Sequence, residues 1–150
     1  MIELVGIATR MRPKAPMQKH HHVTVQTDFG IVGDARAKVN SKRQITVLSA
    51  ESWSEACAAI GKPTLDWTTR RANLFITGKK FGPEDKGKGL RIGAVTLLIV
   101  GECDPCNRME EQVPGLEAAL TPHWRGGVIC KVLRGDDLTI GDTGCILELS

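Results

Sequence analysis

The chain is poor in aromatic side chains and has no long apolar run. It contains no tyrosine, and phenylalanine and tryptophan together make up only 4% of its residues. A small-molecule site would therefore depend on polar and charged groups rather than on aromatic stacking. No apolar segment reaches the length of about 18 residues that a membrane span needs, and charged Glu3 and Arg10 interrupt the N-terminus before a signal-peptide core could form. We expect a cytoplasmic protein.

A strong charge of either sign is also absent. Lys and Arg total 20 against 17 for Asp and Glu, which gives a formal net charge of +3, and the basic residues are scattered along the sequence. This balance indicates neither a nucleic-acid partner nor a membrane partner. The five cysteines are odd in number and follow no export signal, so we expect reduced thiols rather than a disulfide framework.

The sequence does contain enough apolar residues, 41% of 150, to build one domain over residues 1–150. Short segments rich in Val, Ile and Leu, separated by Gly and Asp turns, predict a mainly β barrel or sandwich with helical insertions. One main helix is predicted over residues 49–60, with Ser49 as its N-cap, and a short helix at residues 114–120. The predicted strands are residues 2–9, 23–25, 43–48, 74–77, 90–100, 128–133 and 145–149.

Two cysteines, Cys103 and Cys106, follow the longest apolar run, residues 90–100. A thiol at a strand end is held by a rigid element and can still be reached from solvent, which suits cysteine chemistry. Pro105 disfavours a helix that would run through the pair. Cys57, by contrast, lies among alanines in the main predicted helix and is expected to be a small core residue.

The C-x-x-C spacing of Cys103 and Cys106 is compatible with several chemistries. A structural zinc site would need a second pair, and Cys130 and Cys145 are separated by fourteen residues. A redox dithiol, a single nucleophilic or metal-binding sulfur, and an inert buried pair all stay open on these grounds.

Local charge favours Cys106 as the reactive sulfur. Cys103 lies between Glu102 and Asp104, whose negative charges should hold its thiol protonated. Near Cys106, the guanidinium group of Arg108 can offset those acids. We therefore predict that Cys106 forms the thiolate more readily than Cys103.

Seven motifs follow one another along the chain. They are Gly30-Ile31-Val32-Gly33-Asp34, Arg43-Gln44-Ile45-Thr46-Val47-Leu48-Ser49, Thr69-Arg70-Arg71-Ala72-Asn73-Leu74, Leu90-Arg91-Ile92-Gly93, Cys103-Asp104-Pro105-Cys106-Asn107-Arg108-Met109, Trp124-Arg125-Gly126-Gly127-Val128 and Leu138-Thr139-Ile140-Gly141-Asp142. In this order they resemble the MOSC domain family, named for the C-terminal part of molybdenum-cofactor sulfurases. The resemblance implies a closed, mostly β barrel similar to the small β-domain of pyruvate kinase.

The resemblance also implies sulfur chemistry. Members of this family are proposed to carry sulfur as a cysteine persulfide, taken from a pyridoxal-phosphate-dependent cysteine desulfurase and passed to molybdenum cofactor or another metal–sulfur centre. Other members hold molybdenum cofactor through a cysteine and reduce N-hydroxylated compounds. Pro105-Cys106 matches the key cysteine of the family, and Met109 occupies the place of a further cysteine found in some cofactor-binding members. This pattern favours persulfide carriage over direct molybdenum ligation by Cys106.

The same resemblance implies roles for other residues. Cys103 is a second thiol that could resolve the persulfide or form a disulfide. Arg70, Arg71 and Arg125 are expected to form one anion site for the persulfide or a cofactor phosphate, because guanidinium groups suit such anions. Further contacts are expected from Arg108 and Asn73.

The chain is too short for a desulfurase, so we expect pyridoxal phosphate on a partner protein. Whether the chain by itself catalyses a sulfurtransferase-type or molybdenum-dependent reaction, or acts as a cofactor-binding module, stays open.

Overall fold

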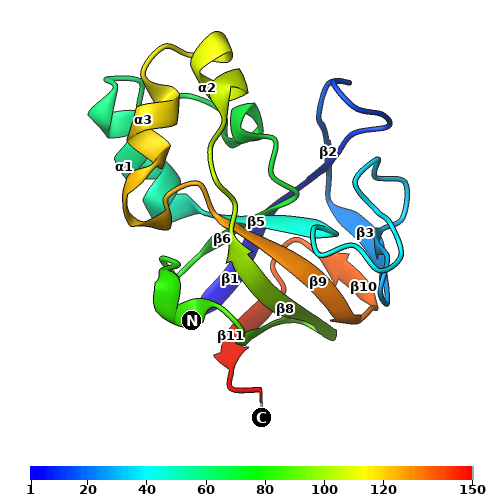
Figure 1. Cartoon of the computed structure of the whole chain (residues 1–150). Coiled ribbons are helices and arrows are strands. Elements are labelled where there is room, and N and C mark those ends of the chain that lie inside the picture. Colours follow the sequence, from blue (N-terminus) through cyan, green and yellow to red (C-terminus); the bar gives the residue numbers. More distant parts are fainter. Residues whose placement is uncertain (150) are drawn as a thin grey trace.

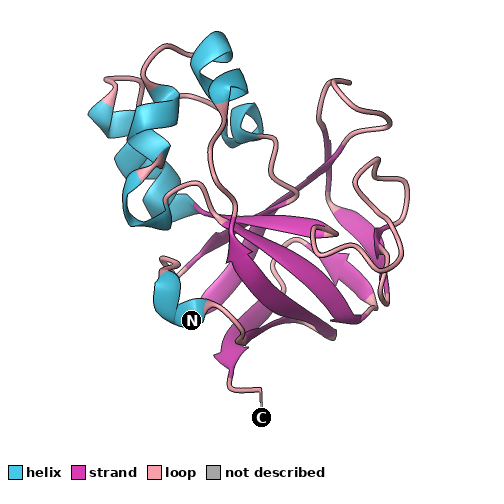
Figure 2. Ribbon diagram, in the orientation of Figure 1, coloured by secondary structure: helices cyan, strands magenta, loops and turns pink. Residues whose placement is uncertain are grey.

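The computed structural model describes residues 1–149, and strands make up most of its regular structure (Figures 1 and 2). The longest helix is α1, Ala50–Ala59, followed by the shorter α2, Asn107–Gln112, and α3, Leu116–Leu120. Three short 3-10 helices are η1, Trp67–Arg70, η2, Pro83–Asp85, and η3, Pro122–Trp124. The strands are β1 Ile2–Thr9, β2 Gln18–His20, β3 His22–Gln26, β4 Gly30–Ile31, β5 Ile45–Ser49, β6 Leu74–Thr77, β7 Gly89–Ile92, β8 Val95–Glu102, β9 Val128–Arg134, β10 Asp137–Thr139 and β11 Thr143–Leu147.

A closed barrel is the centre of the fold. The main sheet runs in the order β11-β7-β8-β9-β5-β6-β1-β2, and β1 also pairs with β11, through Ile2 opposite Gly144. Seven strands therefore close into a ring, and β2 extends from the far half of β1. A second sheet, in the order β10-β3-β4, lies beside the barrel. The predicted mainly β barrel with one main helix is confirmed.

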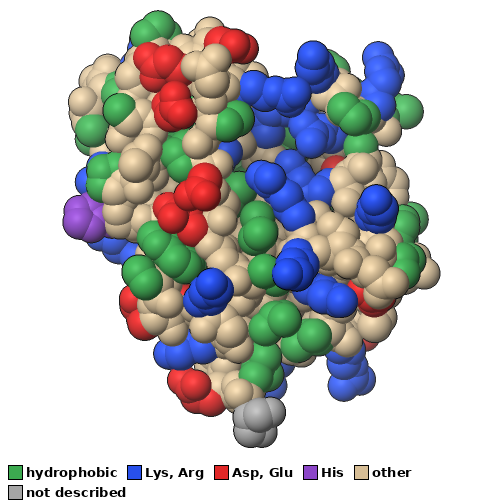
Figure 3. Space-filling view, in the orientation of Figure 1, with side chains coloured by type: hydrophobic (Ala, Val, Ile, Leu, Met, Phe, Trp, Pro, Cys, Tyr) green, Lys and Arg blue, Asp and Glu red, His purple; other side chains and the backbone are tan. Residues whose placement is uncertain are grey.

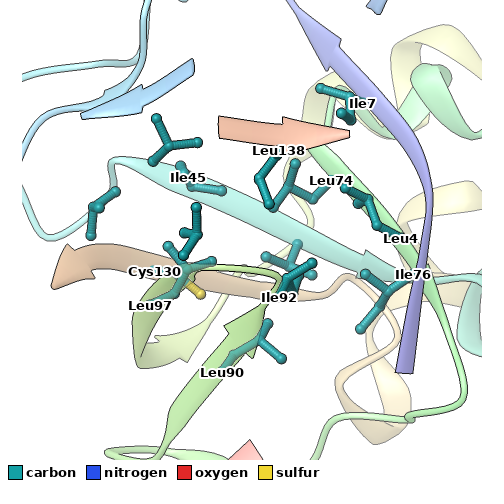
Figure 4. Packing of buried hydrophobic residues seen from close by; sticks show 14 of the residues in the cluster. Leu4, Ile7, Ile45, Leu74, Ile76, Leu90, Ile92, Leu97, Cys130 and Leu138 are labelled. Carbon is teal, nitrogen blue, oxygen red and sulfur yellow. The ribbon is translucent and has the colours of Figure 1, made fainter. Parts of the chain in front are cut away.

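Alternating aliphatic side chains fill the barrel, as expected for strands with one buried face. Leu4, Ile7, Ile45, Leu74 and Ile92 each have about 1% or less of their surface exposed and pack together (Figure 4). Burying one such side chain stabilises the fold by about 1.5–3 kcal/mol. The barrel core is thus sufficient to hold strands that are far apart in the sequence.

The three α-helices gather over one end of the barrel, at upper left in Figure 1. They pack through a second apolar cluster that includes Leu48, Trp53, Leu116 and Leu120. Cys57 belongs to this cluster and is 1% exposed, which confirms it as a core residue. None of the helices in residues 1–149 is long and apolar enough to cross a membrane.

The main helix forms as its sequence signals predict. The Ser49 side chain accepts a hydrogen bond from the Ser52 amide at 3.3 Å and caps α1. Ile60 ends the helix, and Gly61 follows with φ of +69°, a conformation that glycine adopts without steric cost. The short helix predicted at residues 114–120 is also present, as α3.

The apolar run at residues 90–100 is a hairpin rather than the single strand expected. β7 and β8 pair antiparallel, with Leu90 opposite Leu97 and Ile92 opposite Val95. Gly93 turns the chain between them with φ of +56°. Both strands belong to the closed barrel, so both contribute buried apolar residues. The turn between them has no polar residue, which is why the sequence reads as one continuous apolar run.

Candidate functional site

An arginine-lined cleft lies beside α2, next to the end of β8. Its volume is about 320 Å³. Figure 3 shows Lys and Arg side chains gathered in this part of the surface, between the helices and the loop that precedes β2. The residues that line the cleft are Arg10, Arg36, Arg43, Arg70, Arg71, Cys106, Arg108 and Met109.

A smaller pocket of about 20 Å³ shares four of these arginines and therefore adjoins the cleft. We call it the floor of the cleft because its lining includes the buried residues Arg70 and Cys103. Its lining is Arg36, Arg43, Thr46, Arg70, Arg71, Ala72, Cys103 and Gly126. The two thiols of the C-x-x-C segment thus face one cavity at different depths. Cys106 is exposed at its mouth, and Cys103 is 5% exposed at its floor.

Two guanidinium groups hold the sulfur of Cys103. Its Sγ accepts a hydrogen bond from Arg43 Nη2 at 3.2 Å and another from Arg70 Nη2 at 3.2 Å. Arg70 Nη2 also donates to the Cys103 carbonyl oxygen at 2.8 Å. Hydrogen bonds from cationic donors favour the anionic form of a thiol.

The expectation that Glu102 and Asp104 control Cys103 is therefore wrong. Successive side chains of an extended segment point to opposite sides, so Cys103 is buried while Asp104 is exposed. Glu102 lies near Asp104 instead, since burial and the charge of Asp104 raise the pKa of the Glu102 carboxyl. The acids repel each other on the outer side, and the sulfur faces the arginines.

Cys106 is placed by the start of α2. It is the N-cap residue, in extended conformation with φ of −125° and ψ of 174°, and its carbonyl oxygen accepts from the Met109 amide at 2.9 Å. Pro105 keeps the preceding segment out of the helix, as predicted. The thiol that carries the proline signature is consequently exposed on the wall of the cleft.

The cleft concentrates positive charge. Burial, together with the charges of Arg10 and Arg43, lowers the pKa of Arg36 to about 10. Burial and the charges of Arg10 and Arg108 also lower the pKa of Arg71. Within residues 1–149, the buried Nε atoms of Arg10 and Arg71 have no hydrogen-bond partner. An anion in the cleft would relieve this repulsion and supply the missing acceptors.

Comparison with known proteins identifies the family. The sequence model of the MOSC domain matches residues 18–143, which is most of the chain. The chain belongs to the MOSC domain family. No curated protein matches it in sequence.

Solved structures show the same fold for this MOSC domain. YuaD from Bacillus subtilis superimposes with a TM-score of 0.81 at 20% identity, covering 100% of this chain and 98% of that one. YiiM from Geobacillus stearothermophilus gives a TM-score of 0.76 at 17% identity, covering 99% of this chain and 76% of that one. YiiM from Escherichia coli gives 0.70 at 10% identity, with 99% and 71% covered.

The MOSC barrel brings together most of the predicted site. Cys103, Cys106, Arg70, Arg71 and Arg108 all line the cleft or its floor. Arg70 and Arg71 reach different depths because η1 ends between them. Arg70 is buried against the floor, whereas Arg71 has φ of +64° and donates through Nη2 to the Ala15 carbonyl oxygen.

Arg125 does not join this group. Its Nη1 donates to the Ala119 carbonyl oxygen at 3.1 Å, and its Nε lies 4.0 Å from Glu55 Oε1, on the helical side of the domain. The residue of this motif that does contact the site is the next one, Gly126. Gly126 accepts a hydrogen bond from Arg70 Nε at 3.1 Å, and a Cβ there would lie 2.7 Å from the Cys103 carbonyl oxygen. The prediction of one anion site shared by Arg70, Arg71 and Arg125 is wrong for Arg125.

Asn73 is a structural residue rather than part of the lining. Its buried side chain accepts from Arg36 Nη1 at 2.8 Å and from the Thr46 amide at 3.0 Å. Its Nδ2 donates to the Ala8 carbonyl oxygen at 3.1 Å and to Asp34 Oδ2 at 3.3 Å. Asn73 thus orients Arg36 toward the cleft and does not face a ligand itself.

Three arginines of the cleft were not predicted as site residues. Arg36 follows the Gly-Asp turn after β4, Arg43 opens the motif that leads into β5, and Arg10 follows β1. Arg43 lies within one of the family motifs, and Arg36 lies two residues after the end of another. This closeness to the motifs is the only local signal for the two arginines. Their convergence depends on barrel closure.

Metal ligands are scarce around these thiols. In the described part of the chain, no three His, Cys, Asp or Glu side chains cluster closely enough to hold a metal ion. Met109 lines the cleft close to Cys106, at 2% exposure. A metal in this cleft would therefore have Cys106 as its accessible thiolate ligand, and its remaining ligands would have to come from a bound cofactor.

Proposed function

We propose that this MOSC domain carries sulfur as a persulfide on Cys106. The observation that carries the proposal is an exposed thiol on the wall of a cleft lined by six arginines. Exposure allows a donor protein to reach the sulfur, and the arginines suit the negative charge that a persulfide bears. A buried thiol such as Cys103 meets only the second condition.

Loading follows from thiol exchange. The Cys106 thiolate attacks the outer sulfur of a persulfide on the donor, a new S–S bond forms on Cys106, and the donor leaves as its own thiolate. A pyridoxal-phosphate-dependent cysteine desulfurase is the expected donor. Each guanidinium hydrogen bond to the loaded sulfur would contribute about 1.5–3 kcal/mol, because its acceptor is charged.

The acceptor we propose is molybdenum cofactor or another metal–sulfur centre. A cofactor phosphate would find matching donors in Arg71 and Arg108, which line both the cleft and the adjoining hollow beside Lys14. The Nε atoms of Arg10 and Arg71 have no hydrogen-bond partner among residues 1–149, which favours such an anion. Sulfur on Cys106 would then lie in the same cavity as its acceptor.

A second candidate is a cofactor-binding module. In this case the arginines would hold the phosphate of molybdenum cofactor, and the Cys106 thiolate would bind the molybdenum. The bound cofactor would supply reductive chemistry toward N-hydroxylated compounds. Direct ligation is the weaker proposal, because Met109 stands where a second thiolate would assist.

Mass spectrometry of the intact protein tests the proposal. After incubation with a cysteine desulfurase and cysteine, the wild-type chain should gain the mass of one sulfur atom on the peptide that contains Cys106. Cys106→Ser should lose this gain, and Cys145→Ser, on β11 outside the cleft, should keep it. Loading that survives in Cys106→Ser would refute the carrier role, and copurified pterin with metal would support the cofactor-binding module.

A further inference from the structure

Cys103 is a second thiol aimed into the same cavity as Cys106. Of the five free cysteines, Cys57 and Cys130 lie in the two apolar cores, and Cys145 lies on β11. Among the cysteines in the described part of the chain, only Cys103 and Cys106 line the cleft or its floor. The pair is thus separated from the other thiols by position, and it shares the arginines.

We propose that Cys103 is the nucleophile that releases sulfur from Cys106, an inference that rests on the proposed carrier function. The Cys103 thiolate attacks the Sγ of the Cys106 persulfide. The bond between Cys106 Sγ and the outer sulfur breaks, and a Cys103–Cys106 disulfide forms. The outer sulfur takes the electron pair and leaves as hydrosulfide, so it is reduced while the Cys103 thiolate is oxidised to the disulfide.

The hydrogen bonds of Cys103 suit this role. A releasing thiol must be anionic while the carrier is loaded, and Arg43 and Arg70 each donate to its Sγ at 3.2 Å. Two charge-assisted donors stabilise a thiolate in a site where burial alone would oppose it. Burial also protects this thiolate from reagents that reach Cys106, so it attacks the neighbouring persulfide rather than an external sulfur.

The floor pocket suits the leaving group. Its volume of about 20 Å³ exceeds the roughly 10–15 Å³ that one water molecule requires, so it admits one small species and excludes larger thiols. Arg36, Arg43 and Arg70 surround it and would offset the negative charge of hydrosulfide. The disulfide that remains must be reduced by a dithiol reductant before the next loading.

Single-turnover release tests the inference. The wild-type chain is loaded by a cysteine desulfurase and cysteine, separated from both, and kept without added thiol. Free sulfide is then measured together with the intact mass. We expect one sulfide per loaded chain and one Cys103–Cys106 disulfide. Cys103→Ser should load normally, keep its persulfide, and form no intramolecular disulfide.

Arg43→Gln gives a second variant whose altered residue is exposed, so it should fold even if Cys103→Ser does not. Because Arg43 also lines the cleft, release is counted per loaded chain. By that measure, Arg43→Gln should release sulfide about tenfold more slowly than the wild type, as expected for the loss of one charge-assisted hydrogen bond. Cys145→Ser is the control and should release like the wild type.

Equal release from wild type and Cys103→Ser, or unchanged release from Arg43→Gln, would overturn the assignment of Cys103 while leaving the carrier function standing. A wild-type chain that takes no sulfur on Cys106 overturns the carrier function and this inference together.

Discussion

At the scale of residues, burial and cationic neighbours distinguish four of the five free cysteines. Burial raises the pKa of Cys57, and burial with a contribution from the charge of Cys103 raises the pKa of Cys130 well above its ordinary value. These two thiols stay protonated near neutral pH and are inert. Cys106 is exposed among arginines, and Cys103 is buried against two of them. Among these four thiols, reactivity is therefore confined to the segment that carries Cys103 and Cys106.

Brief alkylation near neutral pH should label Cys106 first. Its thiol is open to the reagent, whereas Cys103 is only 5% exposed and the raised pKa values of Cys57 and Cys130 suppress their thiolates. Peptide mass spectrometry at short times measures the order of labelling, and a denatured sample in which all five react is the control. Labelling of Cys103 as fast as Cys106 would contradict the placement of the two sulfurs.

At the scale of elements, a single turn of 3-10 helix aims two adjacent arginines at different depths. Asp66 caps η1 by accepting from the Thr68 amide at 2.9 Å, and it pairs with Lys19 of β2 at 2.6 Å. The helix ends where Arg71 takes φ of +64°. Asp66 therefore ties the element that carries Arg70 and Arg71 to strand β2.

Removing this cap should destabilise the domain in a pH-dependent way. Burial opposes ionisation of Asp66, but the hydrogen bonds from Lys19 and Thr68 lower its pKa from 3.8 to about 2. A lowered pKa means that the ionised carboxylate stabilises the fold above about pH 3.8, and that this contribution disappears as pH falls toward 2.

Asp66→Ala should accordingly lower the free energy of unfolding by about 1 kcal/mol at neutral pH. The difference from wild type should shrink between about pH 4 and pH 2. Denaturant unfolding at several pH values measures it, with exposed Glu3→Ala as the control. A difference that stays constant down to pH 2 would show that the carboxylate charge is not what stabilises η1.

At the scale of the whole molecule, barrel closure assembles a cationic cleft from a sequence with almost balanced charge. The cleft arginines run from Arg10 to Arg108 along the chain, while on the face seen in Figure 3 acidic side chains lie mostly outside it. Burial of these guanidinium groups and repulsion among them cost stability in the free protein, in line with the lowered pKa values of Arg36 and Arg71. Anion binding should reverse that cost.

Sulfate should therefore raise the unfolding temperature. At about 100 times its dissociation constant, a ligand specific for the folded state adds about 2.7 kcal/mol. Arg108→Ala should lose most of this shift, and exposed Arg134→Ala, outside the cleft, should keep it. Since Arg36 loses its proton above about pH 10, the shift should weaken there. Equal shifts in the two variants, measured by thermal unfolding at constant ionic strength, would argue against a sulfate site in this cleft.

Local sequence determined much of this fold. Some features depend only on residues close together in the sequence, so they could be predicted. These features are the cap of α1 at Ser49, the absence of helix before Pro105, and the apolar segments that become strands. The order of the motifs likewise indicated the family, and the Pro105-Cys106 pair indicated which cysteine corresponds to the key cysteine of that family. The predicted boundaries were less accurate. The last strand, for example, begins at Thr143 rather than at Cys145.

The tertiary structure alone decided the charge around the thiols. Glu102 and Asp104 are the sequence neighbours of Cys103, but Arg43 and Arg70, 60 and 33 residues away, are its hydrogen-bond partners. Sequence proximity failed because adjacent residues of an extended chain face opposite sides. The partners across the cleft are set by strand pairing around a closed barrel, which involves residues distant in sequence and leaves no local signal at the residues themselves.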